Sequence, residues 1–163
     1  MVIELLHKSH NRKTFHCEEP SLTAYIQTQV SQDIKRKLAI CFVAIGKKKD
    51  VIGYYTLTSE SLGRESIPEE YLKLVPRNYN APVILLGRLA RDLTKKGTGM
   101  GEHLLLDALF RSYTLSLQSI GAMAVVVDPI NEYAVIFYKK YGFEHLPDSD
   151  KMFLPMKIIE QLI

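Results

Sequence analysis

The sequence predicts an α+β fold, with a mixed sheet built around a β–loop–α–β–α core. Two apolar runs, 81–91 and 122–127, are typical of buried central strands because almost every residue in them is apolar. Between the runs lie a loop with glycines at 97, 99 and 101 and a leucine-rich segment of helical spacing. This order of strand, loop, helix and strand, with further strands on both sides, decides the fold class.

The N-terminal part is predicted to contain three strands, one amphipathic helix and a short second helix. Apolar residues at helical spacing, from Leu22 to Ile34, indicate the amphipathic helix. A lysine-rich turn joins two strands into a hairpin, and Pro76 ends the short helix. The predicted elements are strand 2–6, helix 20–38, strand 39–45, turn 47–50, strand 51–59 and helix 68–74.

The C-terminal part is predicted to contain two helices, each ended by a glycine. Gly121 ends the leucine-rich helix and Gly142 ends the following one. The turn 128–131 leads into that second helix, and the turn 147–150 separates the last two strands. The predicted elements are strand 81–91, helix 101–119, strand 122–127, helix 132–141 and strands 143–146 and 152–156.

Length and composition favour one globular domain, residues 1–163. Hydrophobic residues make up 47% of the chain and charged residues 24%, as in ordinary globular proteins. No apolar run approaches the ~20 residues that span a membrane, and no basic region precedes an apolar stretch at the N-terminus. We therefore expect a cytoplasmic protein without a membrane anchor, in which Cys17 and Cys41 are reduced.

The loop Lys95–Gly101 is the most informative stretch of the chain. Alternating glycines allow a tight turn and a close approach of the backbone to a ligand, and a helix beginning near Gly101 directs free N–H groups into the loop. Such a loop binds phosphate. A nucleotide P-loop is excluded because no lysine followed by a hydroxyl residue comes after the glycines, and a dinucleotide fingerprint because the spacing is Gly-x-Gly-x-Gly.

Two stretches resemble the signatures of the GNAT acetyltransferases. Lys96–Gly101 has the register of their pyrophosphate signature, Arg/Gln-x-x-Gly-x-Gly/Ala, with lysine in the first position, and residues 131–143 resemble their closing signature, Asn-x-x-Ala-x-x-Phe-Tyr-x-x-x-Gly-Phe. Alone, Phe137 and Tyr138 would be interpreted as core aromatics, but the order and separation of two signatures favour the acetyltransferase. The resemblance implies the GNAT fold, a central mixed and mostly antiparallel sheet with splayed central strands flanked by helices.

The resemblance also implies acetyl-CoA as cosubstrate and a role for each site residue. The backbone of Leu89, Ala90 and Arg91 is expected to hydrogen-bond the pantetheine arm. Asn131 is expected to cap its helix or to reach that arm, and Tyr138 to act as general acid toward the CoA sulfur. The resemblance implies direct attack of the amine without an acetyl-enzyme, and the residues agree in one respect, since neither cysteine lies near the two signatures in sequence. The pyrophosphate is expected at Lys96, Gly97, Thr98, Gly99, Met100 and Gly101.

The N-terminal part narrows the resemblance to one group of GNAT proteins. His10–Cys17 is similar to the opening signature His-Asp-x-x-x-Phe-x-Cys-Gly of the GNAT-type toxins of type II toxin–antitoxin modules, with Asn11 for the aspartate and Glu18 for the glycine. These toxins acetylate the α-amino group of aminoacyl-tRNA and so stop translation. The resemblance implies that activity, a ribbon-helix-helix antitoxin as partner and a homodimer. Further similar stretches are 32–36, 51–58 and 85–91.

Acid–base chemistry also favours an α-amine as acceptor. An α-amino group titrates near ~8 and a lysine side chain near ~10.4, so a lysine acceptor needs a general base at neutral pH. No carboxylate of the chain stands out as that base. The net charge of +3 implies little, although local basic clusters fit either a polyanionic partner or solvated helix faces. The residues expected to hold tRNA phosphates are Lys35, Arg36, Arg77, Arg88 and Arg91.

The sequence also leaves two other functions open and offers one candidate metal site. The acceptor could be a small-molecule amine or a protein or peptide amine, or the chain could be an inactive acyl-CoA-binding interaction module. Zinc ligation by histidines and Cys17 is disfavoured, because the chain has no second paired-ligand element and a strand-and-turn location splays the side chains. No metal is therefore expected at His7, His10 or His16.

Overall fold

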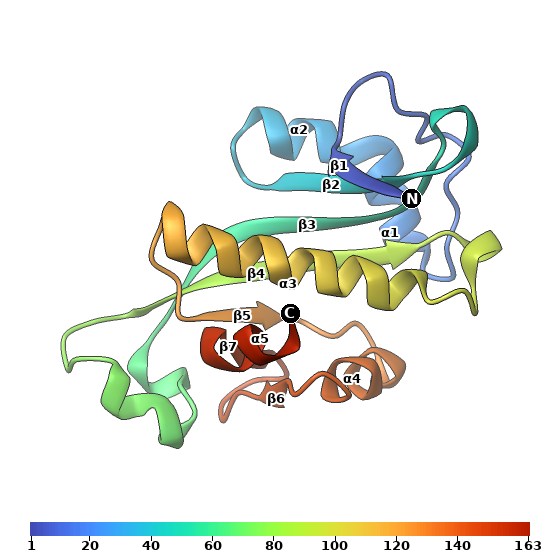
Figure 1. Ribbon diagram of the computed structural model, residues 1–163. Helices are drawn as coiled ribbons and strands as arrows, with labels where there is room; N and C mark the ends of the chain where they lie inside the picture. Colours follow the sequence, from blue (N-terminus) through green and yellow to red (C-terminus); the bar gives the residue numbers. More distant parts are fainter. The chain divides into compact units, whose positions relative to one another are not determined.

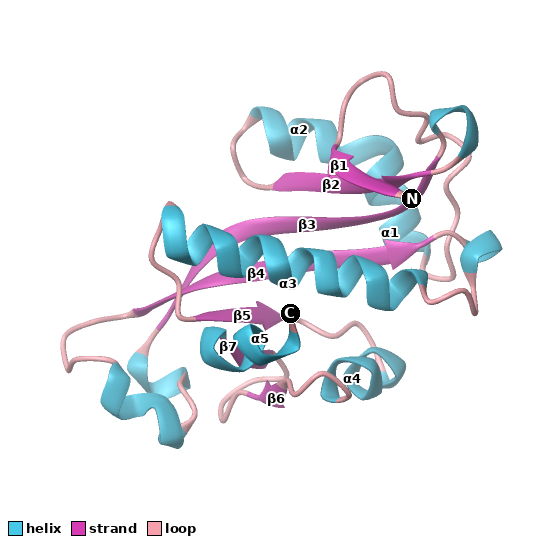
Figure 2. Cartoon of the chain, in the orientation of Figure 1, coloured by secondary structure: helices cyan, strands magenta, loops and turns pink.

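The computed structural model describes residues 1–163, which form two compact units. The first unit comprises residues 1–58 and 87–108, and the second comprises residues 59–86 and 109–163. The boundary between the units falls within two strands and one helix of the chain, so these elements contribute to both. Figure 1 follows the chain from its N-terminus to its C-terminus, and Figure 2 separates helices from strands.

The first unit is built on an antiparallel arrangement of three strands. β1 (Val2–Leu5) pairs with β2 (Ile40–Ile45), and β2 pairs with β3 (Val51–Leu62) (Figure 1). Lys47–Lys49 form the hairpin turn as a 3₁₀ segment, in which Lys48 has a positive φ of 55°. The predicted hairpin is confirmed, and its second strand is three residues longer than the sequence predicted.

The predicted helix 20–38 is divided into three segments. α1 (Pro20–Ala24) leads into a π-helical segment, Tyr25–Gln29, which is followed by α2 (Val30–Lys35). A π-helical turn has a wider hydrogen-bond ring, so it shifts the face that later residues present. The helix ends before residue 38, because Lys37 has a φ of 63° and leaves the helical region.

The core of the first unit lies between these helices and one face of the strands. Phe15 packs edge-on against Tyr54, with 5.5 Å between ring centroids, and Tyr25 stacks on the same ring. Ile26 and Ala90 are buried in the same cluster. The core therefore fixes the N-terminal loop and the end of β4 (Ala81–Arg91) against the same set of aromatic rings.

The long helix α3 (Met100–Gln118) packs on the other face of β3. A Cβ atom at Gly53 would lie 2.8 Å from Leu104 Cδ1, so the glycine permits the close approach of helix and strand. The hydroxyl of Tyr55, two residues further along the strand, donates to Asp107 Oδ2 at 2.6 Å. The predicted leucine-rich helix is confirmed, beginning one residue earlier than expected.

The second unit contains a parallel strand pair and an antiparallel one. The first half of β4, Val83–Leu86, pairs in parallel with β5 (Ala124–Val127), and β5 pairs antiparallel with β7 (Met152–Pro155). The short β6 (Glu144–His145) completes this part of the sheet. Its helices are α4 (Glu132–Lys139), α5 (Met156–Leu162) and two 3₁₀ segments, Arg64–Ser66 and Glu69–Leu74.

The strands form one seven-stranded sheet in the order β1-β2-β3-β4-β5-β7-β6. The pairing of β4 with β5 is parallel, and every other pairing whose register is described above is antiparallel. The predicted fold class, a mixed and mostly antiparallel sheet flanked by helices, is confirmed. The register between β4 and β5 ends at Leu86 and Val127, and β4 continues for five residues beyond it.

The C-terminus is the main point where the sequence prediction was wrong. The last strand ends at Pro155, and residues 156–162 form a helix that was not predicted. Pro155 has an extended φ and ψ and lies at the N-cap position, so it separates the strand from the helix. None of the helices in the structure combines the length and the apolar character required to cross a membrane.

Candidate active site

The loop that follows β4 is held by the carboxylate of Asp92. Asp92 Oδ1 accepts a hydrogen bond from the backbone N–H of His16 at 2.9 Å, and Asp92 Oδ2 accepts from both the N–H and the hydroxyl of Thr94. The Asp92 N–H donates to the carbonyl of Ile52 in β3 at 2.8 Å. Asp92 thereby ties the loop to the N-terminal segment and to the sheet.

These hydrogen bonds determine the charge state of Asp92. Burial alone would raise the pKa of this carboxyl, but the bonds from Thr94 and His16 outweigh burial and hold the pKa below its ordinary value. Sequence reasoning missed Asp92, because one of its partners lies 76 residues away. A local signal existed: aspartate is a preferred N-cap residue, and Asp92 caps the 3₁₀ turn Leu93–Lys95.

Two glycines of the loop have backbone conformations that other residues rarely adopt. Gly97 has a φ of 76° and Gly99 a φ of 83°. A Cβ atom added at either position would meet nothing within 4 Å, so the chain's own packing does not account for the absence of side chains. The glycines give the loop its turn and leave its outer side open to a ligand.

The loop leads directly into the first turn of α3. The N–H of His103 donates to the carbonyl of Gly99 at 3.0 Å, so the intrahelical bonds begin there. The N–H groups of Met100, Gly101 and Glu102 have no partner within the helix. N–H groups without a helical partner and the positive end of the helix dipole are features that favour an anion at a helix N-terminus.

The side chain of Arg91 at the end of β4 is held by Glu18. Its two terminal nitrogens donate to the two carboxylate oxygens at 2.8 and 2.9 Å. The hydrogen bonds from Arg91 lower the pKa of Glu18, and the positive charges of Arg91 and Lys96 contribute to the same shift. Glu18, one of the two residues that depart from the toxin signature, therefore lies within electrostatic range of Lys96, which departs from the pyrophosphate signature.

Arg88 has a different environment from the one its predicted role implied. Its guanidinium lies over the ring of Tyr25, 3.6 Å from the centroid, and the Tyr25 hydroxyl donates to Asp33. A cation–π contact of this geometry orients the arginine side chain on the face of α1 and the π-helical segment. The other residues predicted to contact RNA, Lys35, Arg36 and Arg77, are exposed.

In the second unit, Tyr138 is buried in an aromatic cluster on α4. Its ring makes edge contacts with Phe137 and Phe143, with 5.3 Å between centroids in each case, and the residue is 8% exposed. Burial raises the pKa of Tyr138, and it is the sole cause of the shift. The hydroxyl is therefore protonated at physiological pH, and no hydrogen bond within the protein stabilises either of its forms.

The other buried tyrosines use their hydroxyls within the protein. Tyr25 donates to Asp33 Oδ2 at 2.8 Å, Tyr54 to the carbonyl of Leu22 at 2.6 Å and Tyr55 to Asp107 Oδ2. A buried tyrosine hydroxyl normally has such a partner. Tyr138 differs from these three, because no hydrogen bond within the protein engages its hydroxyl.

Asn131 caps α4, which is one of the two roles predicted for it, the other being contact with the pantetheine arm. Its side-chain oxygen accepts from the N–H of Ala134 at 3.0 Å, and its φ of −162° is extended. This bond satisfies one free donor of the first turn of the helix. The side-chain N–H₂ group of Asn131 has no part in the cap.

Cys17 lies nearer to the loop than its sequence position indicated. The segment around it contacts the end of β4, since the N–H of Leu93 donates to the carbonyl of His16 at 2.9 Å. The Cys17 thiol is nevertheless buried and bonded to Thr23 and to the carbonyl of Glu19. Cys41 is fully buried, and burial raises its pKa to about 12, so both thiols serve the core.

Comparisons with known proteins agree with one another. No family model matches the sequence. A tRNA-acetylating toxin of Mycobacterium tuberculosis (strain ATCC 25618 / H37Rv) is 34% identical over 151 residues, which cover 92% of this chain and 89% of the relative. A probable toxin TacT of Sinorhizobium fredii (strain NBRC 101917 / NGR234) is 27% identical over 163 residues, covering 94% of this chain and 90% of the relative.

Solved structures show the same similarity in three dimensions. AtaT complexed with acetyl-methionyl-tRNAfMet has a TM-score of 0.90 at 30% identity, covering 99% of this chain and 98% of the other. A tyrosine-to-phenylalanine mutant of AtaT, bound to the C-terminus of the antitoxin AtaR and to acetyl-CoA, has a TM-score of 0.82 at 27% identity, covering 99% and 97%. The similarity therefore extends over nearly the whole of each chain.

Proposed function

Because the chain belongs to the tRNA-acetylating toxins of the GNAT superfamily, we propose that it transfers the acetyl group of acetyl-CoA to the α-amino group of an aminoacyl-tRNA. The observation that carries this proposal is the buried Tyr138, whose hydroxyl is protonated and free of internal partners. If the aromatic cluster served packing alone, we would expect the Tyr138 hydroxyl to have a hydrogen-bond partner within the protein, as the hydroxyls of the other buried tyrosines do.

The residues of the glycine loop fit the pyrophosphate of CoA. Gly97 and Gly99 present backbone with open space in front of it, and the first turn of α3 supplies N–H donors. The neighbouring Lys96 is exposed and adds a positive charge. Lysine attracts phosphate as a point charge, without the two parallel bonds that arginine forms. Thr98, Met100 and Gly101 complete the predicted loop.

The end of β4 is proposed to hold the pantetheine arm through its backbone. Residues 89–91 lie beyond the register that β4 shares with β5, so their hydrogen-bonding groups are not used in that pairing. A backbone N–H of this segment also polarises the carbonyl under attack. Asn131 contributes its side-chain N–H₂, because its oxygen is engaged in the cap of α4.

Tyr138 is proposed to donate its proton, or a hydrogen bond, to the departing sulfur. When bound, acetyl-CoA supplies the thioester carbonyl that the amine attacks and the thiolate that leaves. The raised pKa keeps Tyr138 protonated until negative charge develops on the sulfur. The attacking α-amine titrates near ~8, so a sizeable fraction is unprotonated at neutral pH without a general base.

Partners and location are proposed on the same grounds. The AtaT complex with the C-terminus of AtaR supports an antitoxin as partner, and we expect it to be of the ribbon-helix-helix type. We expect the toxin to be a homodimer that acts in the cytoplasm, where charged tRNA is found. Lys35, Arg36, Arg77 and Arg88 are proposed to contact tRNA phosphates, with Arg88 the most constrained because it already stacks on Tyr25.

Labelled acetyl-CoA tests the proposal in a panel of acceptors. The purified protein is incubated with a pool of charged tRNAs, with the same pool after deacylation, with polyamines and with peptides. We expect label in the charged pool alone. Label in polyamines or peptides alone would replace the proposal with a small-molecule or protein acetyltransferase, and no label in any acceptor would favour an inactive acyl-CoA-binding module.

A further inference from the structure

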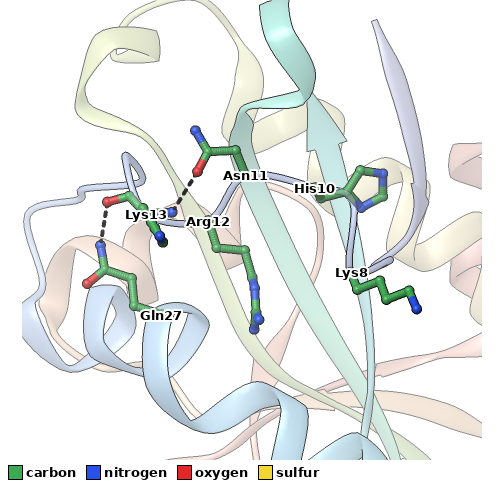
Figure 3. A pocket seen from close by; sticks show the side chains of 6 residues that line it. All are labelled: Lys8, His10, Asn11, Arg12, Lys13 and Gln27. Atoms are coloured by element: carbon green, nitrogen blue, oxygen red, sulfur yellow. Dashed lines mark hydrogen bonds between the residues drawn. The ribbon is translucent and has the colours of Figure 1, made fainter.

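A pocket in the N-terminal loop has a cationic lining that the proposed transfer site does not use. Its volume is about 330 Å³, and it lies entirely within the first unit (Figure 3). A second cavity of about 210 Å³ shares Lys8 and Arg12 with it and extends along α2 to Lys35. Neither cavity is lined by a carboxylate. The lining residues of the first pocket are Lys8, His10, Asn11, Arg12, Lys13 and Gln27.

The positive charges of this pocket are not neutralised within the protein. Arg12 donates to the carbonyl of Ile26 at 3.3 Å and to the hydroxyl of Ser31 at 3.1 Å, and both of these acceptors are uncharged. Lys8 and Lys13 are exposed and take part in none of the ion pairs described. Three cations therefore surround one hollow, which favours an anion as its occupant.

Each of the two carboxylates near the pocket, Glu4 and Asp50, forms a hydrogen bond with a residue that lines it. Glu4 Oε1 lies 3.0 Å from His10 Nε2, while His10 Nδ1 accepts from the N–H of His7, so Nε2 is the ring nitrogen that donates to Glu4. Asp50 Oδ1 accepts from the side-chain N–H₂ of Asn11 at 2.7 Å. Both carboxylates keep their negative charge, but neither of them lines the pocket.

Asn11, which lines the pocket, occupies the position of the aspartate in the toxin signature His-Asp-x-x-x-Phe-x-Cys-Gly. Its side-chain oxygen accepts from the N–H of Lys13 at 3.2 Å, a bond drawn in Figure 3. An aspartate here would add a negative charge to the lining and would face Asp50. The substitution of asparagine removes that charge and leaves a lining that is wholly neutral or positive.

The pocket is built before any ligand binds. The backbone of Asn11 bonds to Lys49 and Val51, at 2.8 and 2.9 Å. Gln27, in the π-helical segment, donates to the carbonyl of Lys13, a bond drawn in Figure 3. It also donates to the carbonyl of Phe15 and so holds the other end of the loop. The loop backbone is therefore held in place without a ligand, and the charged donors that face an anion are those of Lys8, Arg12 and Lys13.

We propose that this pocket binds a backbone phosphate of the RNA acceptor, a role that rests on the proposed function. The second cavity continues the cationic surface to Lys35, as a polyanionic chain requires and a single small anion does not. The N–H of Val51 donates to the carbonyl of Asn11, and the carbonyl of the next residue, Ile52, accepts from the N–H of Asp92. These groups point to opposite edges of β3, so β3 separates the pocket from the glycine loop. The CoA pyrophosphate has its own donors in that loop.

Binding of deacylated tRNA across a series of KCl concentrations tests the proposal. Lys13→Gln and Lys8→Gln are each expected to weaken binding several-fold and to lower the salt slope by about 0.7–0.9, the value for one phosphate contact. Asn11→Asp is expected to weaken binding because it returns a carboxylate to the lining. Lys157→Gln, an exposed lysine of α5, is the matched control and is expected to change the slope less than either variant.

The acetyl-CoA KM separates RNA phosphate from CoA phosphate. This KM is expected to be the same in Lys13→Gln as in the wild type. A higher KM in the variant, together with no such difference when dephospho-acetyl-CoA is the cosubstrate, would overturn the proposal and assign the pocket to a phosphate of CoA. Wild-type slopes in both lysine variants would overturn it too. If the wild-type protein fails to acetylate charged tRNA, the proposed function fails. If the wild-type protein acetylates charged tRNA but the variants bind tRNA with wild-type affinity and salt slope, this inference alone fails. Thermal melting confirms that Asn11→Asp is folded.

Discussion

The glycine loop and the α4 region, each proposed to take part in the reaction, differ in exposure and in the groups that they offer. The loop after β4 is exposed and relies on backbone N–H groups, positive-φ glycines and one exposed lysine. The α4 region is buried and relies on an aromatic cluster around one hydroxyl. An anion needs donors that a solvated ligand can reach, whereas an apolar environment raises the pKa of a tyrosine above its ordinary value. Substitutions in the two regions should therefore affect different kinetic constants.

Tyr138→Phe should have the largest effect. Loss of the hydroxyl removes the general acid, so we expect kcat to fall by about 10²–10⁴-fold while the Kd of acetyl-CoA stays unchanged. Tyr133→Phe, on the same helix but 85% exposed, is the control and should retain wild-type kcat. Steady-state kinetics and calorimetric titration measure the two constants. A fully active Tyr138→Phe enzyme would assign the residue to packing.

Asp92→Ala should have the next largest effect, in the region of the glycine loop. The change removes the acceptor of three hydrogen bonds, so we expect a loss of about 2–3 kcal/mol in the free energy of unfolding and weaker acetyl-CoA binding. Urea denaturation and titration of acetyl-CoA measure these effects. An unchanged affinity would show that the loop does not need this anchor.

The same residue predicts a pH dependence. Because the native pKa of Asp92 is lowered, the unfolded chain binds its proton first as the pH falls. The stabilisation should be complete above the unfolded pKa of about 3.9 and should disappear as the pH falls through the native pKa. Asp92→Asn should thus be less stable than wild type at pH 7, with a difference that shrinks toward pH 3. A constant difference would contradict the assignment.

Gly99→Ala should have a smaller effect that combines strain with exclusion of ligand. Alanine at a φ of 83° costs about 1 kcal/mol, although its Cβ would meet no protein atom. We expect the acetyl-CoA Kd to rise more than stability alone explains, because the Cβ enters the open space where the ligand is proposed to lie. Gly121→Ala has no positive φ and no close neighbour, so it is the control and should leave the affinity unchanged.

Lys96→Arg should have the smallest effect. Arginine restores the residue type of the pyrophosphate signature, and it keeps the positive charge near Glu18. The acetyl-CoA Kd is expected to stay the same or to fall by a few-fold. A clear loss of affinity in the calorimetric titration would mean that the lysine has a role other than attracting the phosphate.

The sequence was sufficient where local pattern decides structure. The apolar run 81–91 matches β4 at both ends, and the glycine loop and α3 follow as expected. The C-terminal helix was missed because Pro155 lies between two apolar stretches that continue one another in sequence. The single predicted helix 20–38 was wrong because apolar spacing does not distinguish an α-helix from one that contains a π-helical turn.

Site features that depend on distant residues were harder to predict. The role of Asp92 requires His16, the fixed position of Arg91 requires Glu18, and the orientation of Arg88 requires Tyr25. Each contact joins the N-terminal segment to the end of β4, and no short signature contains both partners. The basic pocket was missed for the same reason, since Gln27 and Arg12 converge only in the fold.

The position of the acetyl group on the product tests the central claim most directly. A pool of charged tRNAs is incubated with the protein and acetyl-CoA, and the aminoacyl groups are released and mapped by mass spectrometry. The account predicts acetyl on the α-amino nitrogen, including on lysyl groups that also carry an ε-amine. Acetyl on side-chain amines, or on the nucleotides of the tRNA, would contradict it.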